Sequence, residues 1–445
     1  MGNKRTGHSP NPDLRHRVPG PMPRVAEVEE ALWALLSPSL LAPRVLERHD
    51  PRDPQRVIRM RARLLTLPVM VALVVSLVWR RLGAIAEAAR VLVQDGLLWI
   101  APLQVSAQAV AKRLDTLPAS LLAQVFGEVC SRLQTQPPPE LPGLEVWAAV
   151  RSHFSRLAVV DGSTLEALHK KTQTLRGQEG VVLAGRTMVM VEALTQRPLW
   201  QLYTEDAAAN DKRFAAEIVA ALPPGGLLIF DLGFFSFLWF DDFTAQQKFF
   251  VTRLRQKTSY RSLQVLGEGL QYRDELIALG LYRSNPCHHP VRLVSVLWQG
   301  QWYRYLTNVL DPRLLSARQV CELYRRRWRI EDAFLLTKRV LDLAYLWKAS
   351  SNGVQLQLYA TLLFYSVLLS VCQQVAVVLQ QPLERISVEM VFRAFYHYSR
   401  ALERGEVVEL VPYLAAHADL LGLIKRWRKR HRERQQLEQI VWGGS

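Results

Sequence analysis

Leu227-Leu228-Ile229-Phe230-Asp231 is a run of four apolar residues that ends in an acid, and Leu157-Ala158-Val159-Val160-Asp161 has the same form earlier in the chain. Short apolar runs of this kind are typical of buried strands. A carboxylate at the end of such a strand lies at the edge of the sheet, where ligands bind in open α/β folds. Two such acids suit Mg²⁺, which prefers oxygen ligands. Taken singly, each acid also fits a simpler role, because Asp often caps a turn or a helix.

The segments between these two runs predict a mixed α/β core. Residues 186–193 and 198–203 have the pattern of two strands joined by a short turn, which indicates a hairpin. Residues 211–222 have the pattern of a helix, and Pro223-Pro224-Gly225-Gly226 ends it. Three strands, a helix and a further strand form a mixed α/β unit.

The remaining segments divide the chain into four parts. A Pro-rich linker at residues 135–143 separates a helical segment from the α/β unit, and residues from about 235 to 308 are strand-rich. We therefore expect a flexible basic tail (1–24), a helical N-terminal domain that binds DNA (25–145), an α/β catalytic core with a β-rich insertion (146–352) and a helical C-terminal region (353–445).

Composition favours a nucleic-acid partner. The chain has 445 residues, 49% of them hydrophobic, which is enough for several domains and argues against a disordered chain. Lys and Arg outnumber Asp and Glu by 56 to 40, and the formal net charge is +16. Such a surplus favours a polyanion, and nucleic acid before a membrane surface. The four cysteines are scattered, so neither a zinc finger nor a disulfide framework is indicated.

Two apolar stretches resemble membrane spans but are better explained as buried helices. Residues 64–79 contain Pro68 and fall short of the roughly 20 residues that a span needs. Residues 359–379 are long enough, but Gln373 and Gln374 interrupt them. We therefore expect no membrane partner.

The most specific pattern lies in a predicted helix from Ser316 to about Trp347, with Ser316 as its N-cap. Four residues of this helix, spaced 3, 4 and 7 apart, fall within a stripe of about 60° on one face: Tyr324, Arg327, Glu331 and Lys338. A carboxylate there can complete a divalent-metal site, and the cations beside it can hold phosphates. This is the equipment for phosphodiester cleavage with two metal ions. A solvated charged helix is the simpler alternative.

This Tyr-x2-Arg-x3-Glu-x6-Lys spacing resembles the signature of bacterial insertion-sequence transposases of family four. Val160-Asp161-Gly162-Ser163 and Phe230-Asp231-Leu232-Gly233-Phe234 resemble the two acidic motifs of that family. Residues 305–312 resemble its lead-in to the signature helix. The resemblance covers about residues 155 to 352.

The resemblance implies an RNase H-like catalytic core with a β-rich insertion (about 235–308). It implies a DDE transposase whose catalytic and metal-binding residues are Asp161, Asp231 and Glu331, with two Mg²⁺ ions for which Mn²⁺ can substitute. Tyr324, Arg327 and Lys338 would contact DNA near the transposon end.

The same resemblance implies the reaction and the partners. The enzyme would cut double-stranded DNA at terminal inverted repeats, pass through a hairpin, and join the 3′ ends to target DNA. Because two ends are cut together, a homodimer is expected in the synaptic complex. The location would be the bacterial cytoplasm, with the protein nucleoid-associated when bound to DNA.

Further residues are candidates for DNA contact. Arg253 resembles a family position in the first strand of the insertion. Trp298 and Trp302 could hold a flipped base, although both also fit the interior of a sheet. Residues 425–432 carry the charge for phosphate binding, or form a solvated helix end.

Three other functions remain as alternatives to the transposase. The first is a catalytically inactive, domesticated DNA-binding protein derived from such an element; a substituted acid would favour it, but all three acids are present. A membrane protein would rest on the two apolar runs. A Ser or Cys hydrolase lacks support, because no Gly-x-Ser-x-Gly motif is present and Ser163 has no identifiable base partner.

Overall fold

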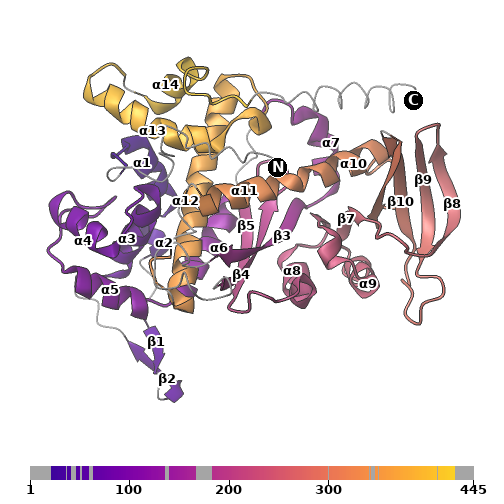
Figure 1. Ribbon diagram of the computed structural model, residues 1–445, viewed down its shortest axis with the longest axis horizontal. Helices are drawn as coiled ribbons and strands as arrows, with labels where there is room; N and C mark the ends of the chain where they lie inside the picture. The colour runs from indigo at the N-terminus through magenta and orange to yellow at the C-terminus, as the bar shows by residue number, and fades with distance from the viewer. Residues whose placement is uncertain are drawn as a thin grey trace, which may run out of the picture.

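The computed structural model describes residues 22–425, apart from residue 37, residues 42–46, 51–52, 60–63, 136–139 and 167–182, residue 299, residue 340, residues 342–345, residue 349 and residue 408. The predicted basic tail (almost all of 1–24), the middle of the predicted linker and nearly all of the basic segment 425–432 lie outside these residues. Helices at the N-terminal and C-terminal ends of the chain lie together, beside a large sheet formed by the middle of the chain (Figure 1).

The sheet has nine strands, which are β3 (Arg156–Glu166), β4 (Leu183–Glu192), β5 (Pro198–Thr204), β6 (Gly226–Ile229), β7 (Phe249–Arg253), β8 (Tyr260–Glu268), β9 (Tyr272–Leu279), β10 (Val291–Trp298) and β11 (Gln301–Thr307). Their order is β5-β4-β3-β6-β7-β11-β10-β9-β8. Strand β6 is parallel to both β3 and β7, and the other pairs are antiparallel. The predicted hairpin is β4–β5. The predicted β-rich insertion continues the same sheet from β7 through β11.

Alternation along the central strands places a core on each face of the sheet. Leu157 and Val159 of β3 belong to one buried cluster, whereas Ala158 and Val160 belong to the other. Successive side chains of a strand point to opposite faces, so a continuous apolar run indicates a strand covered on both sides. One face packs on the helices α8 (Ala215–Ala221) and α9 (Phe237–Ala245).

The opposite face packs against the helical part of the molecule, whose centre is α12 (Ser351–Val378). The helices that surround it are α1 (Ala26–Leu35), α3 (Leu67–Trp79), α5 (Ala107–Thr116), α6 (Ala119–Thr135), α13 (Val388–Glu403) and α14 (Leu410–Ala416). Of the described helices, α12 has the length and composition to cross a membrane, but 78% of its most apolar window is buried inside the protein. It is the core helix expected from the second apolar run.

The remaining elements are α2 (Pro38–Leu41), β1 (Glu47–Asp50), β2 (Asp53–Arg59), α4 (Ile85–Gln94), η2 (Glu145–Trp147), α7 (Ala148–His153), η4 (Asp211–Phe214), η5 (Leu232–Phe234), α10 (Ala317–Arg326), α11 (Trp328–Arg339) and η6 (Leu383–Arg385). The antiparallel pair β1–β2 stands off the N-terminal helices (Figure 1). The sequence predicted a wholly helical N-terminal part, but this part also contains the strand pair β1–β2.

The predicted long helix differs from the structure in two respects. It consists of α10 and α11, which are separated at Arg327, and α11 ends at Arg339 rather than near Trp347. Asn352 and Gly353 lie beyond it, in the first turn of α12, where the Ser350 hydroxyl accepts a hydrogen bond from the Gly353 N–H. This hydrogen bond caps the N-terminus of α12.

Candidate active site

The two predicted acidic residues lie at the same level of neighbouring parallel strands. Val159 of β3 is the last residue paired with β6, opposite Ile229, and Asp161 and Asp231 each follow two residues later. Asp231 leaves the sheet there and caps η5. The sequence predicted Asp161 at the end of its strand. It lies instead within β3, because β3 continues to Glu166 in pairing with β4. The two aspartates therefore lie where β6 ends and where β3 continues with β4 as its remaining partner.

A glycine holds each of these carboxylates. The Gly162 N–H donates a hydrogen bond to Oδ1 of Asp161 at 2.8 Å, and the Gly233 N–H donates one to Oδ1 of Asp231, also at 2.8 Å. Each bond uses one oxygen of the carboxylate and fixes its rotation. The sequence patterns Asp-Gly and Asp-x-Gly thus have a direct structural meaning at this site.

Arg327 connects the first acid to the third. Its guanidinium donates from Nη1 to Oδ2 of Asp161 at 3.1 Å and from Nη2 to Oε1 of Glu331 at 3.0 Å. The Arg327 side chain is only 7% exposed, whereas that of Glu331 is 44% exposed. The guanidinium also lies 4.7 Å from the ring of Trp328. One buried cation therefore draws β3 and α11 together, and brings Glu331 to the edge of the sheet that bears Asp161.

The electrostatics of the site follow from burial and from these neighbours. Burial raises the pKa of Asp161 to about 6, and the charges of Asp231 and Glu331 act in the same direction. The hydrogen bond from Gly162 and the charge of Arg327 oppose that rise. A carboxyl with this pKa is mostly ionised at neutral pH and takes up a proton as the pH falls through about 6.

The other two signature residues occupy the same region. Tyr324 is buried, its ring lies 5.2 Å from that of Tyr305, and burial raises its pKa. The Lys338 ammonium donates a hydrogen bond to the carbonyl oxygen of Thr164 on β3 at 2.7 Å. Tyr324 therefore faces β11, and Arg327 and Lys338 face β3, so these side chains lie on the side of the helices that covers the sheet.

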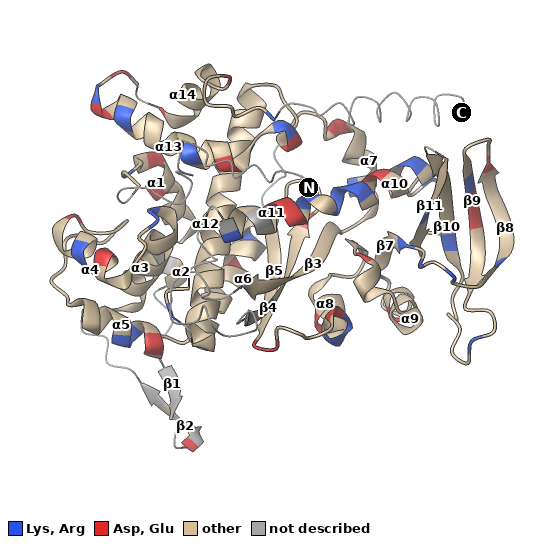
Figure 2. Ribbon diagram, viewed as in Figure 1, with Lys and Arg blue, Asp and Glu red and all other residues tan. Residues whose placement is uncertain are grey.

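Several arginines of the signature helix are structural. Figure 2 shows Lys and Arg along α10 and α11. Arg326 lies 5.0 Å from the ring of Trp147, and burial lowers its pKa to about 10. Arg329 forms an ion pair with Glu384, and burial lowers its pKa to about 9. These two cations face the C-terminal region, so the helix is not simply a solvated charged one.

The weaker DNA-contact candidates lie on the insertion side of the sheet. Arg253, at the end of β7, has its guanidinium 5.8 Å from the ring of Tyr303. Trp298, at the end of β10, is half-buried and lies 5.9 Å from the same ring. Trp302 pairs with Leu297 and is 48% exposed, so its alternative interpretation as an interior residue is wrong.

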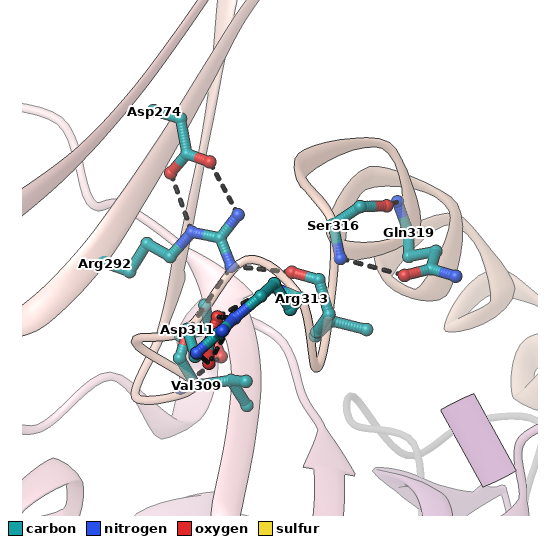
Figure 3. Close-up of polar contacts among 9 residues, drawn as sticks. Asp274, Arg292, Val309, Asp311, Arg313, Ser316 and Gln319 are labelled. Carbon is teal, nitrogen blue, oxygen red and sulfur yellow. Dashed lines mark hydrogen bonds and ion pairs between the residues drawn. The ribbon is translucent and has the colours of Figure 1, made fainter. Parts of the chain in front are cut away.

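The structure reveals an anchor for the signature helix that the sequence did not indicate. Arg292 of β10 is fully buried and forms two bonds with Asp274 of β9, at 2.7 and 2.6 Å. It also donates to the carbonyl oxygens of Val309 and Leu315, at 3.4 and 2.6 Å. Figure 3 shows that these contacts tie the insertion to the segment that leads into α10. The capping box of Ser316 and Gln319 then begins the helix, as its Ser predicted.

A second ion pair that the sequence did not indicate joins two residues that lie between the two acidic motifs in the chain. Arg186 of β4 forms an ion pair with Asp211, the first residue of η4. Burial raises the pKa of Asp211, Arg186 opposes that rise and Asp231 adds to it. In the sequence, Asp211 looks only like the start of a helix, because its partner lies on another strand.

The donor chemistry of the site fits a hard divalent cation, because Asp161, Asp231 and Glu331 offer oxygen atoms alone. In the arrangement described, Arg327 stands between two of these acids. No three His, Cys, Asp or Glu side chains among the described residues lie close enough together to hold an ion. The cation that joins Asp161 to Glu331 in this structure is the Arg327 guanidinium.

The segment that carries this geometry resembles a known family. Residues 152–367, which include β3 to β11 and the signature helix, match the family described as transposase DDE domain.

Two relatives illustrate the likeness. A candidate transposase, y4zB of Sinorhizobium fredii, is 29% identical over 171 residues, which are 37% of this chain and 47% of the relative. The transposase for insertion sequence element IS231F of Bacillus thuringiensis subsp. israelensis is 21% identical over 265 residues, 48% of this chain and 55% of the relative. The chain thus spans about half the length of these relatives.

Among solved structures, a piggyBac transposase synaptic complex with hairpin DNA matches over 92% of this chain and 88% of that one. The sequence identity is 9% and the TM-score is 0.42.

Proposed function

We propose that the chain is a DNA transposase of insertion-sequence family four, with an RNase H-like core, that acts at the terminal inverted repeats of its element. The observation that carries the proposal is the guanidinium of Arg327, which bonds to both Asp161 and Glu331 beside Asp231. Three acids separated widely in the sequence lie in one region at the edge of the sheet, inside the segment that matches the transposase DDE domain. The strand order β5-β4-β3-β6-β7 supports the RNase H-like assignment.

Asp161, Asp231 and Glu331 would hold two Mg²⁺ ions, for which Mn²⁺ can substitute. When bound, such ions activate the attacking oxygen and stabilise the leaving one. The chain's own residues prepare this site. Gly162 and Gly233 fix the rotation of the two aspartates, and the charge of Arg327 offsets the cost of burying Asp161 in its ionised form.

The residues around the acids would grip the DNA. Arg327 and Lys338 can bind phosphates on either side of the reacting bond. Tyr324 would line the surface beside them. Both cations would exchange their present bonds, to the acids and to the Thr164 carbonyl, for phosphate oxygens. Arg253 and Trp298 lie further along the sheet and would contact the flanking DNA. The basic balance of the chain supports the same partner.

The proposed reaction cuts the transposon ends, forms and reopens a hairpin, and joins the 3′ ends to target DNA. A homodimer would hold the two ends together. Such a protein would act in the bacterial cytoplasm, on the nucleoid.

The test is strand cleavage by the full chain on labelled DNA that carries the flanking inverted repeats. We expect nicks or hairpins at the repeat ends with Mg²⁺, none with EDTA, and none with Glu331→Gln. Glu322→Gln is the matched control, because Glu322 lies on the preceding helix and pairs with Arg318 at 2.8 Å, away from the acids. Specific binding without cleavage in any divalent metal would support the inactive DNA-binding alternative, and cleavage that survives Glu331→Gln would refute the assigned third ligand.

A further inference from the structure

Asp211 contacts the backbone of both acidic motifs at once. A Cβ atom placed on Gly162 would lie 2.7 Å from Oδ1 of Asp211, and one placed on Gly233 would lie 3.1 Å from its Oδ2. The first distance is shorter than real Cβ contacts and the second is tight, so a side chain at either position would have to displace this carboxylate. The Asp211 side chain therefore lies between Gly162, which follows Asp161, and Gly233, which is two residues after Asp231.

The glycines that Asp211 touches are the same ones that hold the candidate metal ligands. Gly162 donates its N–H to Asp161, and Gly233 donates its N–H to Asp231. A shift of either glycine would rotate the carboxylate bonded to it. Contact with Asp211 therefore fixes the two motifs relative to each other, in addition to the parallel pairing that stops at Val159 and Ile229.

Arg186 determines where Asp211 lies. Its Nη2 bonds to Oδ1 of Asp211, and it would lie 2.8 Å from a Cβ on Gly162. The two side chains are only 19% and 16% exposed. Arg186 stands on β4 in the register opposite Thr164, so the strand next to β3 supplies the counter-charge. Without it, a carboxylate this close to Asp231 would be repelled.

We propose that Asp211, held by Arg186, is a positioning residue that sets the spacing of the Asp161 and Asp231 carboxylates. This inference rests on the proposed function, because it assumes that these two aspartates hold metal. Residues that orient metal ligands in this way typically change metal affinity by about 10- to 100-fold when they are replaced.

The experiment compares five variants of the full chain with the wild type: Asp211→Ala, Asp211→Asn, Arg186→Ala, the double Ala variant, and Asp161→Asn as the reference for loss of a ligand. Mn²⁺ affinity is measured by electron paramagnetic resonance of the free ion, and hydrogen–deuterium exchange is followed in peptides that contain Gly162 and Gly233. Asp206→Ala is the matched control, since Asp206 precedes Asp211 in the same segment and pairs with Arg213 at 3.4 Å on the surface.

We expect Asp211→Ala and Arg186→Ala each to weaken Mn²⁺ binding by about tenfold or more and to speed exchange in both peptides. The double variant should be no worse than either single one, because the two side chains act as a unit. Asp211→Asn should stay within about threefold of the wild type, since its amide oxygen can still accept the bond from Arg186. Asp206→Ala should change neither quantity.

Three results would overturn the positioning role. Unchanged Mn²⁺ affinity and exchange in Asp211→Ala would show that the contact has no effect. A loss in Asp211→Asn as large as that in Asp161→Asn would make Asp211 a ligand instead. Faster exchange over the whole chain would indicate general unfolding rather than positioning. If the wild type binds no Mn²⁺, the proposed metal site fails, and the exchange measurement alone decides whether Asp211 positions the two motifs.

Discussion

Arg292 and Asp274 form a buried ion pair with two hydrogen bonds, at 2.7 and 2.6 Å, and the same guanidinium bonds to the carbonyl oxygen of Leu315 at 2.6 Å. Leu315 directly precedes Ser316, the N-cap of α10. The insertion therefore does more than extend the sheet: its strands β9 and β10 hold the segment from which the signature helix begins.

Loss of Asp274 should destabilise the protein strongly. Breaking a buried pair leaves one charge without compensation and typically costs about 3–5 kcal/mol. We expect Asp274→Asn to lower the midpoint of urea unfolding, measured by circular dichroism, and to reduce cleavage with it. Asp311→Asn is the control, because the Asp311–Arg313 pair lies nearby on the surface. A midpoint of Asp274→Asn equal to that of the control would contradict the anchoring role.

The pH dependence of stability should report the environment of Asp161. Its pKa in the folded protein is about 6, above its ordinary value of 3.8, so the folded state binds the proton more tightly than the unfolded state. The free energy of unfolding should therefore fall as pH rises from about 4 to 6, by up to about 3 kcal/mol from this group. Urea unfolding of metal-free protein at pH 4.5 and 7 should show that Asp161→Asn gains stability relative to the wild type at the higher pH. An equal difference at both values would mean that the pKa of Asp161 is ordinary.

Gly162 should not tolerate a side chain. Its Cβ would meet Asp211 and the sulfur of Met188, each at 2.7 Å, whereas a Cβ on Gly127 of α6 would have nothing within 4 Å. We expect Gly162→Ala to abolish cleavage and lower the thermal midpoint. Gly127→Ala should keep activity and raise stability by about 0.5–1 kcal/mol, because alanine is the better helix former. Full activity in Gly162→Ala would show that the Arg186 and Asp211 side chains can move away from the new Cβ without loss of function.

The sequence predicted the parts of this site that depend on local pattern. Apolar runs located Asp161 and Asp231, and helical spacing placed Arg327, Glu331 and Lys338 on one side of a helix. The break between α10 and α11 at Arg327 was not predicted. Helical spacing places the same residues on one face whether the segment is one helix or two consecutive helices that share an axis. Asp211 and Arg292 were missed for another reason: their partners, Arg186 and Asp274, lie on other strands, and only the sheet register brings them together.

Lys338 offers a test of whether the signature cations bind phosphate, because its present bond to the Thr164 carbonyl also fits a purely structural role. Each phosphate contact adds about 0.9 to the slope of log affinity against log salt for duplex DNA. If Lys338 moves to a phosphate, Lys338→Met should reduce that slope by about 0.9 and weaken binding of inverted-repeat DNA at low salt. Lys348→Met is the matched control, since Lys348 pairs with Asp115 at 2.9 Å on the helical side of the molecule. Binding would be measured by fluorescence anisotropy between 50 and 200 mM salt, the range over which such contacts change affinity most visibly. A slope unchanged in Lys338→Met, together with a lower unfolding midpoint, would assign Lys338 to the joint between α11 and β3 instead of to DNA.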